Sequence, residues 1–270
     1  MKRFHISFDF IPHFIIIIMA MMPVWTKAQA SGPDLYERQY FIEGDDTLNC
    51  RILSPAHFSS GKKYPLVIVL HGSGERGNDN EAQLKWGSSL FLDSTVREKY
   101  PAIVVFPQCP ADSSWSVRLR FPKNDSTAIR FPMDVPPSKP LQMVMNFIDT
   151  LISNGMVDPK RIYVGGLSMG GFGTFEILWR RPKLFAAAFP ICGGGNPESA
   201  KIYGRKFPIW IFHGTDDNAV PVINSRTMVD ALKAVGAKVK YTEYPGVGHN
   251  SWINAFAEPD LLPWLFSQKK

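Results

Sequence analysis

The sequence predicts an α/β fold, in which a mostly parallel sheet of about eight strands carries helices on both faces. Runs of consecutive apolar residues at 66–70 (LVIVL) and 208–212 (PIWIF) are typical of strands buried on both faces, as in parallel sheets. Segments with helical periodicity alternate with such runs, which is the pattern of an α/β domain. The chain has 270 residues, which suits one large domain with a substantial core.

The charge distribution argues against a nucleic-acid partner. The formal net charge of +6 is spread along the chain without a block of lysine or arginine, so we interpret it as a solubility feature. The sequence shows no cysteine pairs at zinc-binding spacing, no internal repeats and no low-complexity tract. A metal site is therefore not expected.

Residues 1–30 have the features of a secretory signal peptide. Lys2 and Arg3 supply a positive start, residues 14–22 form an apolar run, and residues 28–30 form an A-x-A cleavage signal. We predict removal after Ala30, which leaves 31–270 as the folded domain of a secreted or periplasmic protein. The apolar run is too short for a comfortable membrane span, so no span is expected after cleavage. The alternative is an uncleaved N-terminal anchor.

Three cysteines remain in the predicted domain, Cys50, Cys109 and Cys192. In an oxidising compartment an odd number of cysteines leaves at least one of them free. We interpret all three as small buried hydrophobic residues, and the sequence leaves open whether two of them form a disulfide.

The first half of the domain is expected to hold a hairpin, two buried strands and a helix. A β-hairpin is predicted within residues 31–53, where the turn-like residues 43–46 separate two strand-like runs. After it we expect the strand at 66–70, a helix at 81–91 and a strand at 102–106.

A long irregular segment, residues 111–139, follows the strand at 102–106. Loops of this length usually have a function. We predict that this segment is an insertion over the active site and forms part of an acyl-binding or sugar-binding wall, with Trp115 and Arg118 as candidates for substrate contact. The alternative is a solvated excursion that touches no substrate.

The second half continues the alternation of strands and helices. A helix is predicted at 141–152, with Ser138 as its N-cap. The remaining expected elements are, in order, a strand at 162–164, a helix at 172–179, strands at 186–191 and 208–212, a helix at 223–235, a strand at 239–244, and a closing helix from 253 to 256 or to 265.

The main chemical signal is the run Gly166-Leu167-Ser168-Met169-Gly170, which fits the G-x-S-x-G nucleophile elbow. In such an elbow a strand turns sharply into a helix, and the serine hydroxyl is exposed above the sheet. Side chains two residues before and after the serine would collide, which explains both glycines. The pattern alone is weak, but its strand-like and helix-like flanks favour a nucleophile over an incidental serine.

A serine nucleophile needs a base within hydrogen-bonding distance, and the base needs an orienting carboxylate. His249 lies on a glycine-flanked loop after the last predicted strand, where a base can reach back over the sheet. His71 and His213 precede glycines at strand ends and are expected to brace loops. The loop after 208–212 supplies Asp216 and Asp217, and chemistry alone does not separate these neighbours.

Acyl transfer also needs two backbone N–H groups directed at the developing oxyanion. We predict the first at Met169, directly after the serine, and the second at Ser73 in the glycine-rich loop 71–77. This loop follows the carboxyl end of a parallel strand, where α/β sheets place their sites. A phosphate-binding loop is the disfavoured alternative, because the lysine and the spacing of such a loop are missing.

Together these motifs resemble the α/β-hydrolase superfamily. The chain looks most similar to compact secreted esterases grouped with feruloyl and acetylxylan esterases, polyhydroxybutyrate-depolymerase-like proteins and the phospholipase/carboxylesterase family. The shared residues are His71-Gly72-Ser73-Gly74, the elbow extended to Gly171, the H-G-x-x-D-x-x-V-P stretch at 213–221, and Gly248-His249. The resemblance places the family's nucleophile on Ser168, its aspartate on Asp217 and its base on His249. The segment 111–139 is a departure from the smaller members.

The resemblance implies a secreted serine esterase that acts through an acyl-enzyme on a small-molecule or polysaccharide ester, such as an acyl or feruloyl ester. It implies no metal and no organic cofactor. Trp252, close to the histidine loop, joins Trp115 and Arg118 as a candidate for substrate contact. The alternatives are a peptidase similar to the catalytic domain of prolyl oligopeptidases and a hydrolase-fold binding protein without turnover. The sequence leaves the identity of the substrate and the oligomeric state open.

Overall fold

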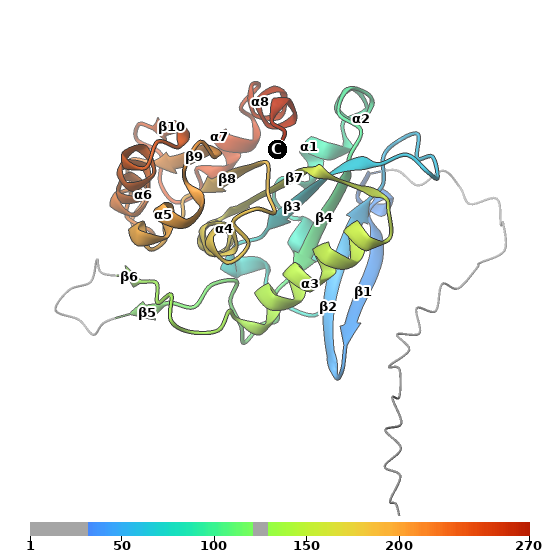
Figure 1. Ribbon diagram of the computed structural model, residues 1–270, viewed down its shortest axis with the longest axis horizontal. Coiled ribbons are helices and arrows are strands. Elements are labelled where there is room, and N and C mark those ends of the chain that lie inside the picture. The colour runs from blue at the N-terminus through green and yellow to red at the C-terminus, as the bar shows by residue number, and fades with distance from the viewer. Residues whose placement is uncertain (1–31, 121–128) are drawn as a thin grey trace, which may run out of the picture. The chain divides into compact units, whose positions relative to one another are not determined.

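A computed structural model describes residues 32–120 and 129–270 and confirms the α/β architecture. The main sheet has eight strands in the order β1-β2-β4-β3-β7-β8-β9-β10 (Figure 1). Their bounds are β1 (Glu37–Glu43), β2 (Asp46–Leu53), β3 (Tyr64–Leu70), β4 (Ile103–Gln108), β7 (Val157–Leu167), β8 (Ala187–Ile191), β9 (Pro208–Gly214) and β10 (Lys238–Tyr244). The pairs β1–β2 and β2–β4 are antiparallel, and every pair from β4 to β10 is parallel.

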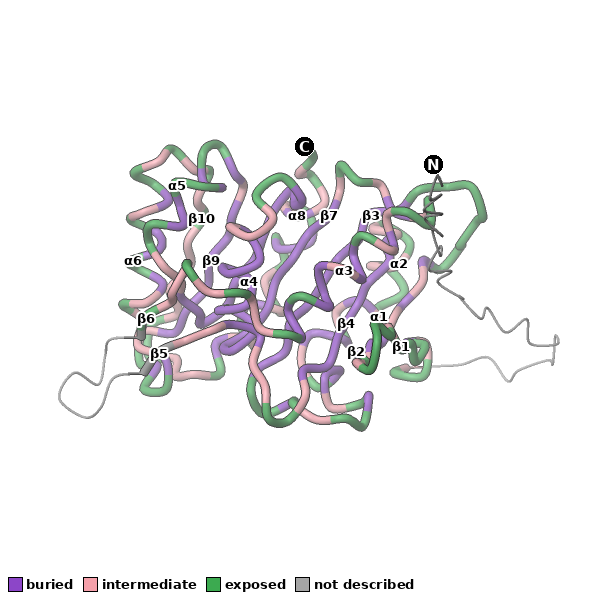
Figure 2. Tube along the Cα trace, turned by 60° about the horizontal axis from the view of Figure 1, so that its bottom comes forward, coloured by how far each residue is buried: buried purple, intermediate pink, exposed green. Residues whose placement is uncertain are grey.

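The central strands are buried on both faces, as their apolar runs predict. Every residue of β3 is buried, and its side chains alternate between two core clusters. Leu66 and Ile68 belong to one cluster, and Val67 and Val69 belong to the other. The sheet is therefore covered on both faces, and buried residues concentrate along its central strands (Figure 2).

Two sets of helices provide this cover. The first cluster includes residues of α3 (Lys139–Ser153), α4 (Met169–Arg180) and α6 (Ile223–Ala234), and the second includes residues of α1 (Ser88–Leu92), α7 (Trp252–Phe256) and α8 (Leu261–Ser267). The predicted cap of α3 is confirmed, because the Ser138 side chain accepts the Leu141 N–H.

The single helix predicted at 81–91 is wrong. The structure has a 3₁₀ turn at Ala82–Leu84 and then α1, and the two are separated by Gly87 with φ +79°. A left-handed residue cannot continue a right-handed helix, so the helical segment is interrupted there. The unpredicted helix α2 (Ser94–Lys99) follows, and the Asp93 carboxylate caps it.

Smaller elements also differ from the prediction. The closing helix is divided into α7 and α8, and the irregular segment 111–139 contains the short strands β5 (Leu119–Arg120) and β6 (Ile129–Arg130). A further short helix, α5 (Ala200–Tyr203), follows β8. These pieces are too short to have a clear periodicity in the sequence.

The signal peptide predicted at residues 1–30 lies outside the described residues. In the described part of the chain, no helix combines the length and the apolar character that crossing a bilayer requires. The cysteines Cys50, Cys109 and Cys192 are buried and free, in agreement with their interpretation as small hydrophobic residues.

Candidate active site

Ser168 lies at the turn from β7 into α4, with φ 53° and ψ −112°. Positive φ is uncommon for a residue that has a side chain, so this backbone is strained. A Cβ atom on Gly170 would lie 1.9 Å from the carbonyl oxygen of Leu70, and one on Gly166 would lie 2.6 Å from the same oxygen. Both glycines of the predicted elbow are therefore required, because the backbone at the start of α4 lies against the end of β3.

His249 connects Ser168 to a carboxylate. The Nε2 atom of His249 lies 2.9 Å from Ser168 Oγ, and its Nδ1 atom lies 2.8 Å from Asp217 Oδ2. The three residues follow β7, β9 and β10, so parallel strands deliver them to one edge of the sheet. When Nδ1–H is donated to the carboxylate, Nε2 is the atom that accepts the serine proton.

The structure distinguishes the two neighbouring aspartates. The Asp217 side chain is fully buried, and its Oδ1 atom accepts the backbone N–H groups of Ala219 (2.9 Å) and Val220 (2.8 Å). Asp216 is exposed, and its carboxylate accepts the hydroxyl of Thr215. Only Asp217 therefore faces the imidazole of the histidine loop.

His213 is a second imidazole beside Asp217. Its Nε2 atom lies 2.8 Å from the carbonyl oxygen of Val220 and 3.2 Å from Asp217 Oδ2, and its Nδ1 atom lies 2.6 Å from Ser225 Oγ. His213 was expected to brace a loop, and its contact with Asp217 was not expected from the sequence. The only signal for this contact was the four-residue spacing of the H-G-x-x-D stretch.

These contacts set the charge of Asp217. Burial raises the pKa of the Asp217 carboxyl, but hydrogen bonds from His213, His249 and the Val220 N–H outweigh burial and hold this pKa well below its usual range. The carboxylate therefore stays ionised over the whole neutral range and can accept the Nδ1–H of His249.

Ser73 and Met169, the residues expected to donate to an oxyanion, lie at the ends of adjacent strands. Ser73 begins a 3₁₀ turn after β3, and Met169 is the first residue of α4 after β7. β3 and β7 are paired up to Leu70 and Gly166. The geometry thus brings the loop after β3 and the start of α4 to one place, and the oxyanion hole stays a prediction.

The loop after β3 is held rigidly by His71. Its Nε2 atom accepts the N–H of Cys109 (2.9 Å), and its Nδ1 atom donates to the carbonyl of Gly72 (2.6 Å). Burial lowers the pKa of His71 to about 4, so the ring is neutral at pH 7 and one nitrogen remains an acceptor. His71 braces the loop, as expected from the sequence.

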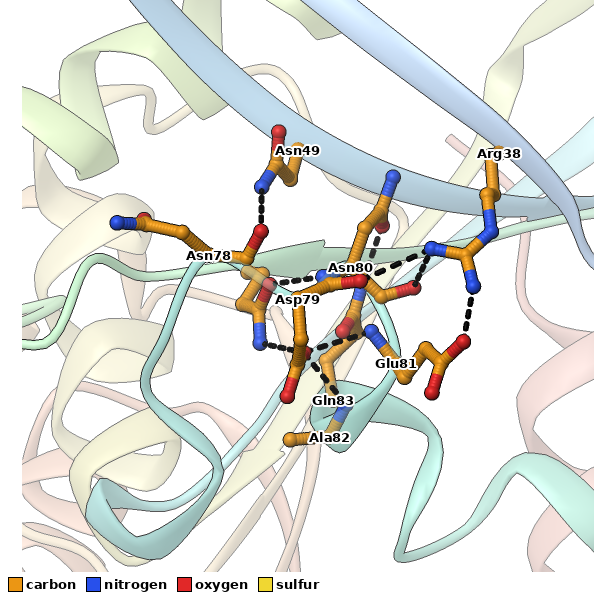
Figure 3. A network of polar contacts seen from close by, with 9 residues as sticks. Arg38, Asn49, Asn78, Asp79, Asn80, Glu81, Ala82 and Gln83 are labelled. Carbon is orange, nitrogen blue, oxygen red and sulfur yellow. Dashed lines mark hydrogen bonds and ion pairs between the residues drawn. The ribbon is translucent and has the colours of Figure 1, made fainter.

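A polar network fixes the downstream part of the same loop (Figure 3). The Arg38 side chain, from β1, donates to the carbonyls of Asp79 and Asn80, and Asp79 Oδ1 accepts the N–H of Glu81 (2.8 Å). Gln108, at the end of β4, donates to Asp79 Oδ1 (2.7 Å) and accepts the N–H of Asn80 (2.7 Å). The loop is thereby tied to two strands of the sheet.

The three candidates for substrate contact have different surroundings. Trp115 is completely buried and donates its indole N–H to the carbonyl of His71 (3.1 Å), so its expected role as a substrate contact is wrong and it supports the loop from beneath. Arg118 is half-buried and stacks on Phe172, 4.6 Å from the ring centroid. Trp252 is half-buried and lies edge-on against His249, with ring centroids 5.3 Å apart.

The described part of segment 111–139 packs against α4 just after the nucleophile. The rings of Phe131 and Phe172 have centroids 5.4 Å apart, and the Asn196 amide donates to the carbonyl of Phe131 (2.9 Å). Residues 130–134 and 195–197 line a groove of about 440 Å³. Residues 121–128, in the middle of the segment, lie outside the described residues.

Within the described ranges, the side chains of Cys192, Asp217 and His249 form a group of metal-ligand type, with ligand atoms within 4.8 Å of one another. A thiol binds a metal ion as the thiolate. Burial raises the pKa of Cys192, which disfavours the thiolate, and the other two side chains are hydrogen-bonded to each other. The arrangement favours proton transfer at Ser168 over metal binding.

Comparison with known proteins gives a consistent picture. The chain matches the family described as Phospholipase/Carboxylesterase over residues 56–258. It is 28% identical over 170 residues to the bifunctional acetylxylan esterase/xylanase XynS20E of Neocallimastix patriciarum (63% of this chain, 21% of that protein). It is 29% identical over 204 residues to feruloyl esterase B of Piromyces equi (70% and 33%). The chain therefore spans a third or less of these two relatives.

A solved structure described as a thermostable esterase has a similar fold. It superposes with a TM-score of 0.79 at 37% sequence identity, over 88% of this chain and 64% of that chain.

Proposed function

The chain belongs to the phospholipase/carboxylesterase family, and from this premise we propose that it is a serine carboxylesterase. The observation that carries the proposal is the pair of hydrogen bonds that connects Ser168 to His249 and His249 to the buried carboxylate of Asp217. These two hydrogen bonds supply the base and the orienting group that a serine nucleophile requires.

In the proposed first half-reaction, Ser168 Oγ attacks the ester carbonyl while His249 Nε2 takes the hydroxyl proton. The ionised Asp217 holds the imidazole tautomer and stabilises the imidazolium that forms. The tetrahedral oxyanion receives hydrogen bonds from the backbone N–H groups of Ser73 and Met169. The C–O bond to the alcohol then breaks, and His249 returns its proton to the alcohol oxygen, which leaves an acyl group on Ser168.

In the second half-reaction a water molecule replaces the alcohol. His249 Nε2 takes a proton from this water as the oxygen attacks the acyl carbon, and it returns the proton to Ser168 Oγ when the acid departs. The strained elbow supports both steps, because it holds Ser168 Oγ at the end of β7 within 2.9 Å of His249 Nε2.

We further propose that the substrates are acyl or feruloyl esters of polysaccharides and that the protein is secreted. The similarity to an acetylxylan esterase/xylanase and to a feruloyl esterase supports the substrate class. The apolar run at 14–22 and the A-x-A signal before Ser31 support export. The groove between residues 130–134 and 195–197 is the proposed acyl-side wall, because its Phe131 packs on Phe172 four residues after the nucleophile.

The test is a hydrolysis panel on residues 31–270 with Ser168→Ala as the matched variant. Acetyl, butyryl and long-chain nitrophenyl esters, methyl ferulate, acetylated xylan and a prolyl amide make up the panel. We expect turnover of the ferulate or xylan ester, and a loss of kcat of at least about 10³-fold in the variant, because the nucleophile is removed.

Covalent labelling separates the other outcomes. A fluorophosphonate should label Ser168 in the wild-type protein and leave the variant unlabelled. Turnover of the amide alone would replace the proposal with a peptidase. A folded Ser168→Ala protein with full esterase activity would contradict the mechanism. If the wild-type protein hydrolyses no substrate of the panel and is not labelled, a binding protein would be favoured.

A further inference from the structure

Two half-buried tryptophans, Trp86 and Trp252, are linked by ring contacts to the proposed base, His249. Trp252 packs edge-on against His249, with ring centroids 5.3 Å apart and an interplanar angle of 86°. Trp86 packs on Trp252 in turn, with ring centroids 5.8 Å apart. The two indoles come from segments far apart in the chain, and Trp252 connects Trp86 to the ring of His249.

The contact between these segments is tightly packed. Trp252 and Phe256 are four residues apart on α7, so they share one face of that helix. The Phe256 ring lies against Gly87, where a Cβ atom would be 2.5 Å from the ring and where φ is +79°. Neighbouring residues Trp86 and Gly87 thus receive neighbouring rings of α7, and the position of Trp86 relative to His249 is fixed by the fold.

Glu75 adds a charged group to the two indoles. The residue is buried, with 5% of its surface exposed. Glu75 Oε1 accepts the indole N–H of Trp86 (3.2 Å), and Oε2 lies 3.0 Å from the place where a Cβ on Gly72 would stand. The carboxylate therefore bridges the loop that carries Ser73 to the outer indole, and the catalytic steps described above do not use it.

The chemistry of the proposed reaction determines which part of the substrate reaches the wall formed by Trp86, Trp252 and Glu75. His249 Nε2 gives its proton to the departing alcohol, so the alcohol must lie on the histidine side of Ser168. We propose that Trp86, Trp252 and Glu75 form the subsite for the alcohol part of the ester, and that this alcohol is a sugar. The inference rests on the proposed esterase function and specifies its substrate on the side of the alcohol.

A sugar fits the composition of the wall better than an alkyl chain does. A pyranose or furanose ring presents C–H groups on one face, which suit an indole surface, and hydroxyl groups at its rim. The rim of this wall carries a cation, because the exposed Lys85 has its Nζ atom 5.3 Å from the Trp86 ring centroid. An alkyl chain would cover this ammonium group and offer it no hydrogen bond, at a cost in binding.

The experiment compares two esters of one acid, a sugar ester and a methyl ester. The pairs are a feruloylated methyl arabinoside with methyl ferulate, and an acetylated methyl xyloside with methyl acetate. In Trp86→Ala, the ratio of kcat/KM for the sugar ester to kcat/KM for the methyl ester should fall by about tenfold, because the stacking surface for the sugar is lost. Trp179→Ala, which removes a half-buried tryptophan at the far end of α4, is the matched control, and its ratio should stay at the wild-type value.

Glu75 is tested as a positioning residue for Trp86. Glu75→Gln keeps an oxygen that accepts the indole N–H, whereas Glu75→Ala removes it. We expect the ratio of kcat/KM for the sugar ester to that for the methyl ester to keep its wild-type value in Glu75→Gln. In Glu75→Ala this ratio should fall as it does in Trp86→Ala. Equal ratios in these two variants would contradict the positioning role.

The remaining outcomes separate this inference from the esterase proposal. If Trp86→Ala lowers kcat/KM equally for the sugar ester and the methyl ester, or for neither of them, the subsite is overturned while the esterase function stands. If the variant instead loses activity on an octyl ester and keeps the sugar ratio, the wall binds an alkyl chain and the sugar assignment is wrong. If the wild-type protein hydrolyses neither ester of a pair, and no nitrophenyl ester, the esterase proposal itself fails.

Discussion

At the scale of single residues, the backbone contact between β3 and α4 determines which side chains the elbow tolerates. A Cβ atom on Gly170 would lie 1.9 Å from the Leu70 carbonyl oxygen and 2.8 Å from that of His71. Both neighbours are backbone atoms of the central region, and they cannot move away as the end of a flexible side chain does. The glycine is thus a packing requirement of the fold as well as part of the motif.

We therefore predict that Gly170→Ala destabilises the protein by more than about 3 kcal/mol, as overpacking against backbone does. Urea unfolding of the variant and the wild type measures the difference. Gly74→Ala is the matched control, because nothing lies within 4 Å of a Cβ at that position, and its unfolding free energy should stay within about 0.5 kcal/mol of the wild type. Equal stability of the two variants would refute the argument.

His71 makes a pH-dependent contribution at the same scale. Burial lowers its pKa to about 4 in the folded protein, from an ordinary value near 6.5. Between these two values the unfolded chain binds a proton on His71 that the folded chain does not bind, so the free energy of unfolding falls as the pH falls. The contribution is complete above the ordinary value and is lost once the pH is below the folded-state value.

The expected size of this loss is about 3 kcal/mol between pH 6.5 and pH 4. His71→Gln keeps an acceptor for the Cys109 N–H and does not titrate, so its stability should fall less over that range. Denaturant unfolding of both proteins at pH 4, 5, 6 and 7 gives the comparison. Parallel pH profiles would show that His71 does not stay neutral in the folded protein.

At the scale of elements, Trp115 anchors the start of segment 111–139 to the body of the domain. The indole is completely buried and bonds to the carbonyl of His71. It also lies against α4, where a Cβ on Gly173 would be 2.5 Å from Trp115 Cβ. A single side chain therefore joins the inserted segment, the loop after β3 and the helix after the nucleophile.

Trp115→Ala should lower the free energy of unfolding by about 3–5 kcal/mol, because it leaves a large cavity between these elements. Trp115→Phe retains a ring and loses the hydrogen bond to the His71 carbonyl, so we expect a smaller loss in that variant. Thermal and urea unfolding of both variants provide the test. A Trp115→Ala protein as stable as the wild type would mean that the segment is not anchored at this point.

At the scale of the whole molecule, residues from distant parts of the sheet are buried in one folded unit that spans 31–270. The three free thiols lie in separate parts of this unit, since Cys50 lies in β2, Cys109 follows β4 and Cys192 follows β8. Burial raises the pKa of all three, that of Cys109 to about 12. Their reactivity in the native state therefore depends on opening of the fold.

We predict that a thiol reagent labels all three cysteines with one common rate constant under native conditions, because each becomes reactive only when the domain unfolds. Mass spectrometry of digested, time-resolved samples measures each site. In guanidinium chloride all three should react at once, which serves as the control. Faster labelling of one cysteine would reveal local opening and contradict a single cooperative unit.

Local patterns in the sequence determined the fold class, most strand positions and the residues proposed for catalysis. The apolar runs of β3 and β9 and the glycine spacing around Ser168 are properties of consecutive residues, so they are visible without the fold. The predicted helix at 81–91 was wrong because Gly87 adopts φ +79°, and this residue packs against the Phe256 ring, which lies far away in the chain.

Only the tertiary structure decided questions that depend on contacts between distant residues. It supplied the hydrogen bond from His249 to Asp217, the aspartate that the family resemblance had already favoured over Asp216. It placed His213 beside the same carboxylate, and it buried Trp115, which the sequence had suggested for substrate contact. It also brought Trp252 against His249, Trp86 against Trp252, and Glu75 against the Trp86 indole. The physical reason is that burial and charge environment arise from packing across the sheet edge, whereas periodicity and turn chemistry arise from neighbours along the chain.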